Sequence, residues 1–224
     1  MEQRAMNNIA VYTSIFGEAD EPKIQPEIDG IDYILFTDKD RGGQGVRVSE
    51  AKYNNNRMSA KWYKVFPHLC LPEYRYTIFL DGSLQIKDPT YCIQALNYIG
   101  EDGIGLWKHP DRIDLTEECK ASKPMVKYAN TLVIEQGEHY SREGVPKDSG
   151  MWCTGTIVRD NWNPRMREAM EQYIKEMEEW TYQDQISFPY IVWKMGLKIG
   201  EFPESFGSFD ENPWFYRIPH KNDD

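Results

Sequence analysis

The run Tyr76–Leu80, followed at once by Asp81, Gly82 and Ser83, constrains this chain more than any other feature. The run is apolar, contains aromatic and β-branched residues and has the length of a strand, so it predicts a buried strand that ends at a carboxylate. Ligands of open α/β sheets bind beyond the carboxyl ends of the strands. An aspartate at that edge is well placed to hold a divalent cation that in turn holds a phosphate. An ordinary Asp-Gly turn is the structural alternative.

Strand-like and helix-like segments alternate along the chain. The apolar runs predict strands at 8–16, 32–37, 76–80, 84–86, 104–107, 151–158 and 197–202. Caps, prolines and glycines predict helices at 54–67, 89–99, 164–180 and 184–195. Asp114 and Glu117 form the pattern of a capping box for a further, mostly polar helical region.

The alternation predicts an α/β protein with a mixed, mainly parallel sheet flanked by helices. No repeat, low-complexity tract or linker divides the chain. We therefore expect a single domain over residues 1–224, with its core at about 8–202. The remainder, 203–224, is expected to be an irregular tail that is rich in aromatic residues and proline.

Charge and composition exclude several classes of protein. The formal net charge of −10 disfavours nonspecific contact with nucleic acid or with an anionic membrane. No apolar run approaches the ~20 residues of a membrane span, and the polar first residues carry no secretory signal. The four cysteines are far apart without C-x-x-C spacing, so neither a zinc site nor a disulfide framework is expected. These features predict a cytoplasmic protein with reduced thiols and no membrane partner.

Two nucleotide or phosphate chemistries lack their motifs. The glycines of residues 41–45 (RGGQG) do not form a phosphate-binding loop between a strand and a helix, and G-x-G-x-x-G is absent. The run from Asp81 to Leu84 invites comparison with the D-x-D-G-T-L pattern of aspartyl phosphatases. The nucleophile position of that pattern is Phe79 here, which forms no phosphoenzyme.

Several segments, in order, resemble one branch of the glycosyltransferases of the GT-A fold. They are Arg57–His68 (RMSAKWYKVFPH), Tyr74–Ser83 (YRYTIFLDGS), Lys108–Arg112 (KHPDR), Gly155–Arg159 (GTIVR) and Asp184–Phe188 (DQISF). The chain from about Ile9 to Gly196 is similar to the glycosyltransferase-like family once catalogued as domain of unknown function 616, which is related to the family eight type glycosyltransferases. The resemblance implies a GT-A-like domain that transfers a sugar from a nucleotide-diphosphate sugar to a saccharide or other hydroxyl-bearing acceptor, assisted by Mn or Mg.

The resemblance also implies roles for individual residues. Asp81 corresponds to a D-x-D metal ligand, with Ser83 in place of the second acid and His220 as a further candidate ligand. The residues expected to contact the donor are Thr13, Asp38, Arg57, Lys61, Lys64, Asp81, Gly82, Ser83 and Gly155. The residues expected to face the reacting sugars are Asp184, His109 and Asp111.

The residues themselves leave structural alternatives open. The helix face of Arg57, Lys61 and Lys64 also suits a solvated surface, His109 also suits a structural His-Pro turn, and Asp184 also suits a helix cap. Because Ser83 stands where the D-x-D motif has its second acid, a second function stays open: a catalytically inactive saccharide- or nucleotide-binding module. The sequence names neither donor nor acceptor, and a modified nucleobase stays open as acceptor although binding to nucleic acid is not expected.

Overall fold

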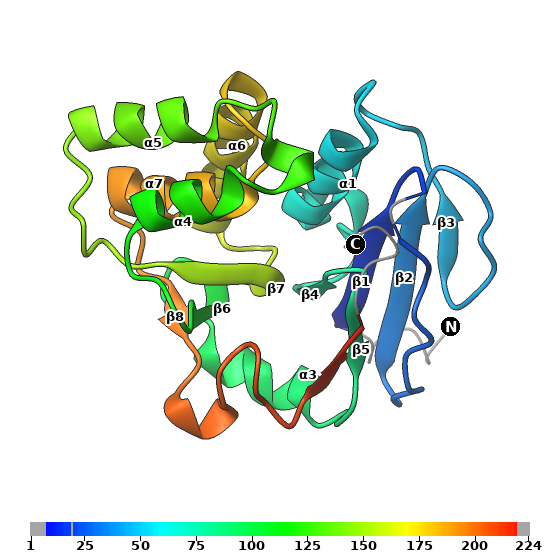
Figure 1. Ribbon diagram of the computed structural model, residues 1–224. Helices are drawn as coiled ribbons and strands as arrows, with labels where there is room; N and C mark the ends of the chain where they lie inside the picture. Colours follow the sequence, from blue (N-terminus) through cyan, green and yellow to red (C-terminus); the bar gives the residue numbers. More distant parts are fainter. Residues whose placement is uncertain (1–7, 19, 219–224) are drawn as a thin grey trace.

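The computed structural model describes residues 8–18 and 20–218. Within them, seven strands form one sheet in the order β3-β2-β1-β4-β7-β6-β8 (Figure 1). The strands are β1 (Ile9–Ile15), β2 (Ile31–Thr37), β3 (Val46–Val48), β4 (Tyr76–Leu80), β6 (Ile104–Lys108), β7 (Trp152–Asp160) and β8 (Gly200–Glu201). β1 pairs in parallel with both β2 and β4, and β7 runs antiparallel to β4 and β6. The predicted α/β fold with a mixed, mainly parallel sheet is confirmed.

The predicted helices are present, with changes at their ends. The main helices are α1 (Asn56–Val65), α2 (Pro67–Cys70), α4 (Leu115–Ser122), α5 (Val133–Arg142), α6 (Pro164–Glu179) and α7 (Asp184–Met195). The Asn55 side chain caps α1 by accepting from the amides of Arg57 and Met58. Asp114 caps α4 in the same way through the Thr116 amide. The helix expected at 89–99 is shorter and divides into α3 (Tyr91–Gln94) and the 3₁₀ helix η2 (Ala95–Tyr98).

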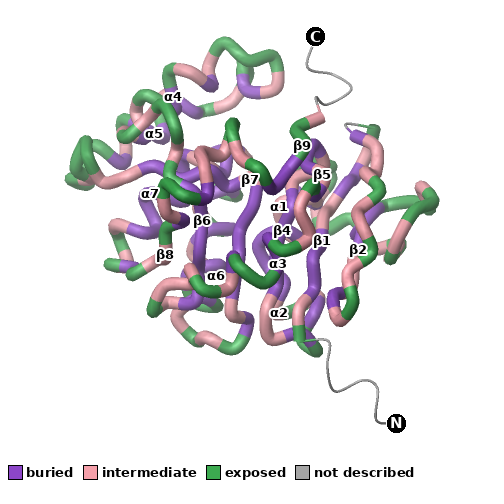
Figure 2. Tube along the Cα trace, turned by 90° about the horizontal axis from the view of Figure 1, so that it is seen from below, coloured by how far each residue is buried: buried purple, intermediate pink, exposed green. Residues whose placement is uncertain are grey.

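Strand alternation sends side chains to two cores, one on each face of the sheet. Tyr12 and Phe79 enter the core beneath α1, α4, α5, α6 and α7. Val11, Ile78 and Leu80 enter the second core, beneath α3 and the C-terminal segment. The strands in the middle of the sheet are buried along their length (Figure 2). Of the described helices, none is long and apolar enough to cross a membrane.

The C-terminal segment differs from the expected irregular tail. A 3₁₀ helix, η4 (Glu204–Phe206), is followed by β9 (Phe215–Arg217), which pairs antiparallel with β5 (Leu84–Ile86) in a second small sheet. Trp214 and Phe215 are buried in the second core. The prediction of an irregular tail was wrong for these residues, because a three-residue strand leaves no periodic signal and its partner lies far away in sequence.

Candidate active site

The turn after β4 is tied to the neighbouring strand. The Asp81 amide donates to the Gly155 carbonyl of β7 at 2.7 Å, and the Leu84 amide closes the turn on the Asp81 carbonyl at 2.9 Å. The Ser83 amide and hydroxyl both donate to Asp81 Oδ1, at 3.3 and 3.4 Å. A Cβ on Gly82 would lie 2.6 Å from Asp20 Oδ2. The loop after β1 therefore packs directly on this turn, and a glycine is required there.

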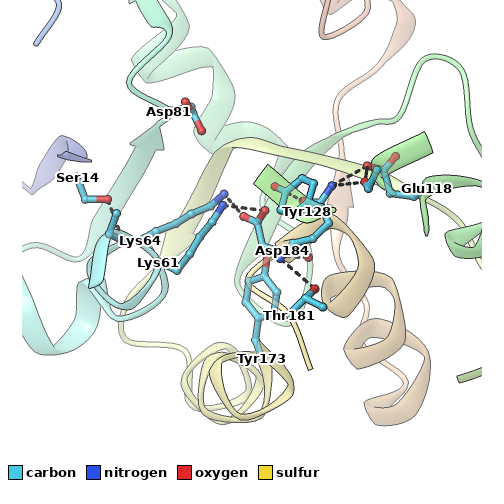
Figure 3. Close-up of polar contacts among 12 residues, drawn as sticks. Ser14, Lys61, Lys64, Asp81, Glu118, Tyr128, Tyr173, Thr181 and Asp184 are labelled. Atoms are coloured by element: carbon cyan, nitrogen blue, oxygen red, sulfur yellow. Dashed lines mark hydrogen bonds and ion pairs between the residues drawn. The ribbon is translucent and has the colours of Figure 1, made fainter. Parts of the chain in front are cut away.

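Two lysines of α1 converge on one carboxylate at the start of α7. Lys61 Nζ lies 2.8 Å from Asp184 Oδ1, and Lys64 Nζ donates to Asp184 Oδ2 (Figure 3). The side chains of Lys64 and Asp184 are 2% and 5% exposed, whereas that of Lys61 is 19% exposed. We call these three residues the lysine–aspartate cluster. Within it, Lys61 is the residue that solvent or a ligand reaches.

Strands from both halves of the sheet hold the cluster in place. The Tyr12 hydroxyl donates to the Lys64 carbonyl at 2.6 Å, and Arg159 Nη1 donates to the same carbonyl at 3.0 Å. The Tyr173 hydroxyl of α6 donates to the Asp184 carbonyl at 3.1 Å. The Lys64 ammonium also lies 4.8 Å from the centre of the Phe79 ring. These contacts fix the backbone from which the charged groups extend.

Charge and burial shift the pKa values of Lys64 and Asp184 in opposite directions. Burial lowers the pKa of Lys64 to about 8, although Asp184 and Asp81 act to raise it. Burial would raise the pKa of Asp184, but Lys61 and Lys64 outweigh it and hold that pKa well below its ordinary value. Asp184 is therefore ionised at neutral pH, and its carboxylate is shared by the side chains of Lys61 and Lys64. The effect of Asp81 on Lys64 shows that the turn after β4 and the cluster share one electrostatic environment.

The helix-cap alternative for Asp184 does not hold. The N-cap of α7 is Gln183, and the cap makes no side-chain hydrogen bond. The Thr181 hydroxyl accepts from the Gln183 amide at 3.2 Å, while the Asp184 carboxylate lies between the two lysines. The structure thus brings together Lys61, Lys64 and Asp184, which the sequence assigned to a site without predicting that they touch.

A cavity of about 280 Å³ lies on the other face of the sheet, between β1, β2 and two loops. Its floor includes Val11, Thr13, Tyr33 and Leu80, and its walls are residues 21–25 and 41–44. No helix is found in the described part of the connection between the parallel strands β1 and β2, where a helix is usual. The loop that replaces it forms one cavity wall. We call this space the β1–β2 cavity.

Thr13 and Asp38 were both predicted to face the nucleoside; Thr13 lines the β1–β2 cavity, whereas Asp38 is not among its lining residues. The Asp38 carboxylate accepts from the Gly17 amide at 3.0 Å and from Arg41 at 2.7 Å. Burial acts to raise the Asp38 pKa, but these hydrogen bonds and the Arg41 charge lower it overall. Arg41, which lines the cavity, also donates to Thr37 Oγ1 at 2.7 Å. Asp38 therefore positions Arg41 and the end of β1.

His109 and Asp111 form a structural turn. His109 Nδ1 accepts from the amides of Asp111 and Arg112, each at 3.1 Å, and burial lowers the His109 pKa despite the charge of Glu118. The Asp111 residue is exposed. The His-Pro turn alternative accounts for these contacts.

Sequence reasoning missed the buried network beside this turn. Glu118 Oε2 accepts from Arg112 at 2.7 Å, and Glu118 Oε1 accepts from Gln183 Nε2 at 2.9 Å. The Tyr128 hydroxyl donates to Gln183 Oε1 at 3.0 Å. The network ends next to Asp184. No sequence signal pointed to this network, because the burial of Glu118 cannot be read from a mostly polar helical region.

The remaining predicted site residues have separate places. A Cβ on Gly155 would lie 2.5 Å from the Phe209 ring, so this glycine has a packing role. Arg57 lies on the exposed first turn of α1, and His220 lies outside the described residues. Among the described residues, no three His, Cys, Asp or Glu side chains gather closely enough to hold a metal ion. Asp81, with the Ser83 hydroxyl beside it, supplies one carboxylate, and Mg²⁺ is commonly held by one or two carboxylates together with substrate phosphates.

Residues 43–206 match the family model described as "TOD1/MUCI70, glycosyltransferase-like domain". The chain belongs to this family. It is 23% identical over 228 residues to the probable hexosyltransferase MUCI70 of Arabidopsis thaliana, covering 88% of this chain and 39% of that protein. It is 24% identical over 155 residues to the alkaline ceramidase TOD1 of the same plant, covering 65% of this chain and 34% of that protein. The chain thus spans well under half of the length of either relative.

Solved structures share the fold. The apo structure of the bifunctional glycosyltransferase WbbM superposes with a TM-score of 0.54 at 10% identity, over 92% of this chain and 41% of that one. The crystal structure of mouse xyloside xylosyltransferase 1 in apo form gives a TM-score of 0.46 at 10% identity, over 89% of this chain and 86% of that one. The likeness to WbbM and the family match confirm the predicted glycosyltransferase-like fold and family.

Proposed function

We propose that the chain transfers a sugar from a nucleotide-diphosphate sugar to a hydroxyl-bearing acceptor. The observation that carries the proposal is the lysine–aspartate cluster, in which two ammonium groups share one buried carboxylate and one of them, Lys64, is within electrostatic reach of Asp81 in the turn after β4. A diphosphate is the part of such a donor that a fixed positive charge stabilises. The similarity to MUCI70, a probable hexosyltransferase, supports a hexose donor.

The donor would lie across the turn after β4. The β1–β2 cavity, with the Tyr33 ring and the Arg41 guanidinium in its lining, suits the planar base and the ribose. The diphosphate would then lie between Asp81 and the cluster. Lys61, the more exposed lysine, is placed to contact phosphate oxygens. Thr13 would face the nucleoside, and Asp38 would act through Arg41.

Lys61 and Lys64 would stabilise the negative charge that develops on the leaving diphosphate. In the transfer, the bond between the anomeric carbon and the phosphate oxygen breaks and its electron pair stays on the leaving diphosphate. The acceptor oxygen forms the new bond to the anomeric carbon, and its proton passes to an oxygen of the leaving diphosphate or to water. Asp184 holds its pKa low and has an ammonium group on each oxygen, so it is poorly suited to take that proton. We propose that Asp184 positions the two lysines. Mn or Mg dependence stays a prediction of the resemblance, and no step is assigned to a metal.

A thermal-shift series with nucleoside diphosphates and their sugars, each with and without Mn, tests the proposal. A ligand at about 100 times its Kd stabilises the native state by about 2.7 kcal/mol, which raises the Tm by roughly 5–10 °C at this size. We expect one base to give such a shift, and Lys61→Met to reduce it. Lys175→Met, at an exposed position of α6, is the matched control. A folded protein that responds to none of these ligands would contradict the proposal.

The alternative function is an inactive binding module. It is supported by Ser83, which stands where the D-x-D motif has its second acid. It predicts the same thermal shift without turnover. Release of nucleoside diphosphate from the donor sugar that gives the shift, measured with a panel of saccharide acceptors, separates the two functions. Binding without release would favour the module.

A further inference from the structure

The segment that joins α4 to α5 has a charge pattern opposite to that of the whole chain. Residues 119–134 contain Lys120, Lys123 and Lys127 and neither Asp nor Glu, whereas the chain has 26 Lys and Arg against 36 Asp and Glu. The acidic side chains next to the segment are Glu118, which is buried and bonded to Arg112, and the exposed Glu117 and Glu135.

The same segment exposes apolar side chains. Val126 is 91% exposed, the highest value among the large apolar side chains described, and Met125 and Leu132 are 42% and 48% exposed. Single exposed apolar residues are ordinary on protein surfaces. Three of them in one short segment, interleaved with lysines and free of acidic residues, form a basic and apolar tip. We use the term α4–α5 tip for residues 120–132.

Hydrogen bonds hold the base of the α4–α5 tip in one conformation. The Thr131 hydroxyl donates to the Tyr128 carbonyl at 2.8 Å, and Lys123 Nζ donates to the Thr131 carbonyl at 3.1 Å. The Tyr128 hydroxyl is bonded to Gln183, and the Tyr182 hydroxyl donates to the Lys127 carbonyl. A surface that is already ordered loses little conformational entropy when it binds a partner.

We infer that the α4–α5 tip docks on an anionic lipid surface. Apolar side chains flanked by lysines match the boundary between acyl chains and headgroups, where the apolar atoms leave water and the ammonium groups meet anionic headgroups. The acidic remainder of the chain would be repelled by the same surface, which fixes the orientation with the tip toward the lipid. A soluble polyanion would use the lysines but gives no reason to expose Val126 and Met125. The inference does not depend on sugar transfer.

Co-sedimentation of the full chain with vesicles tests the inference. We expect binding to vesicles of phosphatidylcholine with phosphatidylserine, weakening with salt, and little binding to phosphatidylcholine alone. Val126→Asp should weaken it by roughly 10-fold, because the buried apolar area is lost. Lys120→Ser should weaken it by about 5-fold. Val48→Asp is the matched control, since Val48 is 61% exposed on the edge strand β3.

Several outcomes would overturn the inference. One is the absence of binding to vesicles with phosphatidylserine, and another is vesicle binding that Val126→Asp leaves unchanged. A third is binding to dextran sulfate that depends on Lys120 and is as tight as vesicle binding, which would assign the tip to a soluble polyanion. Val126→Ser serves as a second variant if Val126→Asp alters the melting curve of the chain.

Discussion

Replacing the two most buried members of the lysine–aspartate cluster, singly and together, measures how strongly they are coupled. Asp184→Asn leaves two ammonium groups without their carboxylate, one of them on a side chain that is 2% exposed. Removing one partner of a buried ion pair costs about 3–5 kcal/mol of the free energy of unfolding. Lys64→Met should cost less, since Lys61 still pairs with Asp184. The double variant should be more stable than Asp184→Asn alone, because the most buried unpaired charge is gone.

Urea unfolding of the wild type, both single variants and the double variant at neutral pH gives the four free energies. We expect a coupling energy of about 2–3 kcal/mol, at the upper end for residues in contact. The exposed pair Arg165 and Glu168, 42% and 55% exposed, provides a control cycle with an expected coupling of about 0.5 kcal/mol or less. Losses for Asp184 and Lys64 that add within about 0.5 kcal/mol would refute the assignment of a buried, mutually dependent pair.

Three further results are expected. The folded-state pKa of Asp184 lies below its ordinary value of 3.8, so the ionised carboxylate stabilises the folded chain above pH 3.8 and this stabilisation is lost as the pH falls below it. Between pH 6 and pH 3, the Tm should therefore fall less in Asp184→Asn than in the wild type. Equal slopes of Tm against pH would contradict this. Gly155→Ala should cost about 1–3 kcal/mol by overpacking against Phe209, and Phe209→Ala in the same chain should recover part of it in urea unfolding. NMR titration of His109 should give a midpoint below the ordinary 6.5; a midpoint above 6.5 would remove the structural-turn assignment.

The sequence allowed a good prediction of the fold because its main signals are local. The strand at 76–80, the Asn55 cap and the helix that begins at Asp184 are each read from a few adjacent residues. Strand β9 could not be predicted, because its three residues become a strand only by pairing with β5.

The sequence predicted which residues belong to the candidate site but not which of them contact one another. The common helix face of Lys61 and Lys64 follows from their spacing, but their partner Asp184 lies 120 residues after Lys64, and only the tertiary fold brings them together. Glu118 and Gln183 gave no signal, since burial of a polar side chain on an amphipathic helix depends on what packs over it. The role of Asp38 toward Arg41 likewise depends on the geometry of two loops.

Two separate parts of the sequence build the two sides of the candidate active site, and β7 joins them. Residues 156–160 of β7 pair with β4, while Trp152 and Cys153 lie beyond the end of β4 and pair with β6. Segments before Leu84 build the β1–β2 cavity, the turn that follows β4 and the helix that carries Lys61 and Lys64, and later segments supply the opposite side, including Asp184 and the α4–α5 tip. A recombination point in the exposed turn after Lys87 would therefore exchange one side while retaining the other. Chimeras of family members joined there should keep the nucleotide preference of the N-terminal parent and take the acceptor preference of the C-terminal parent.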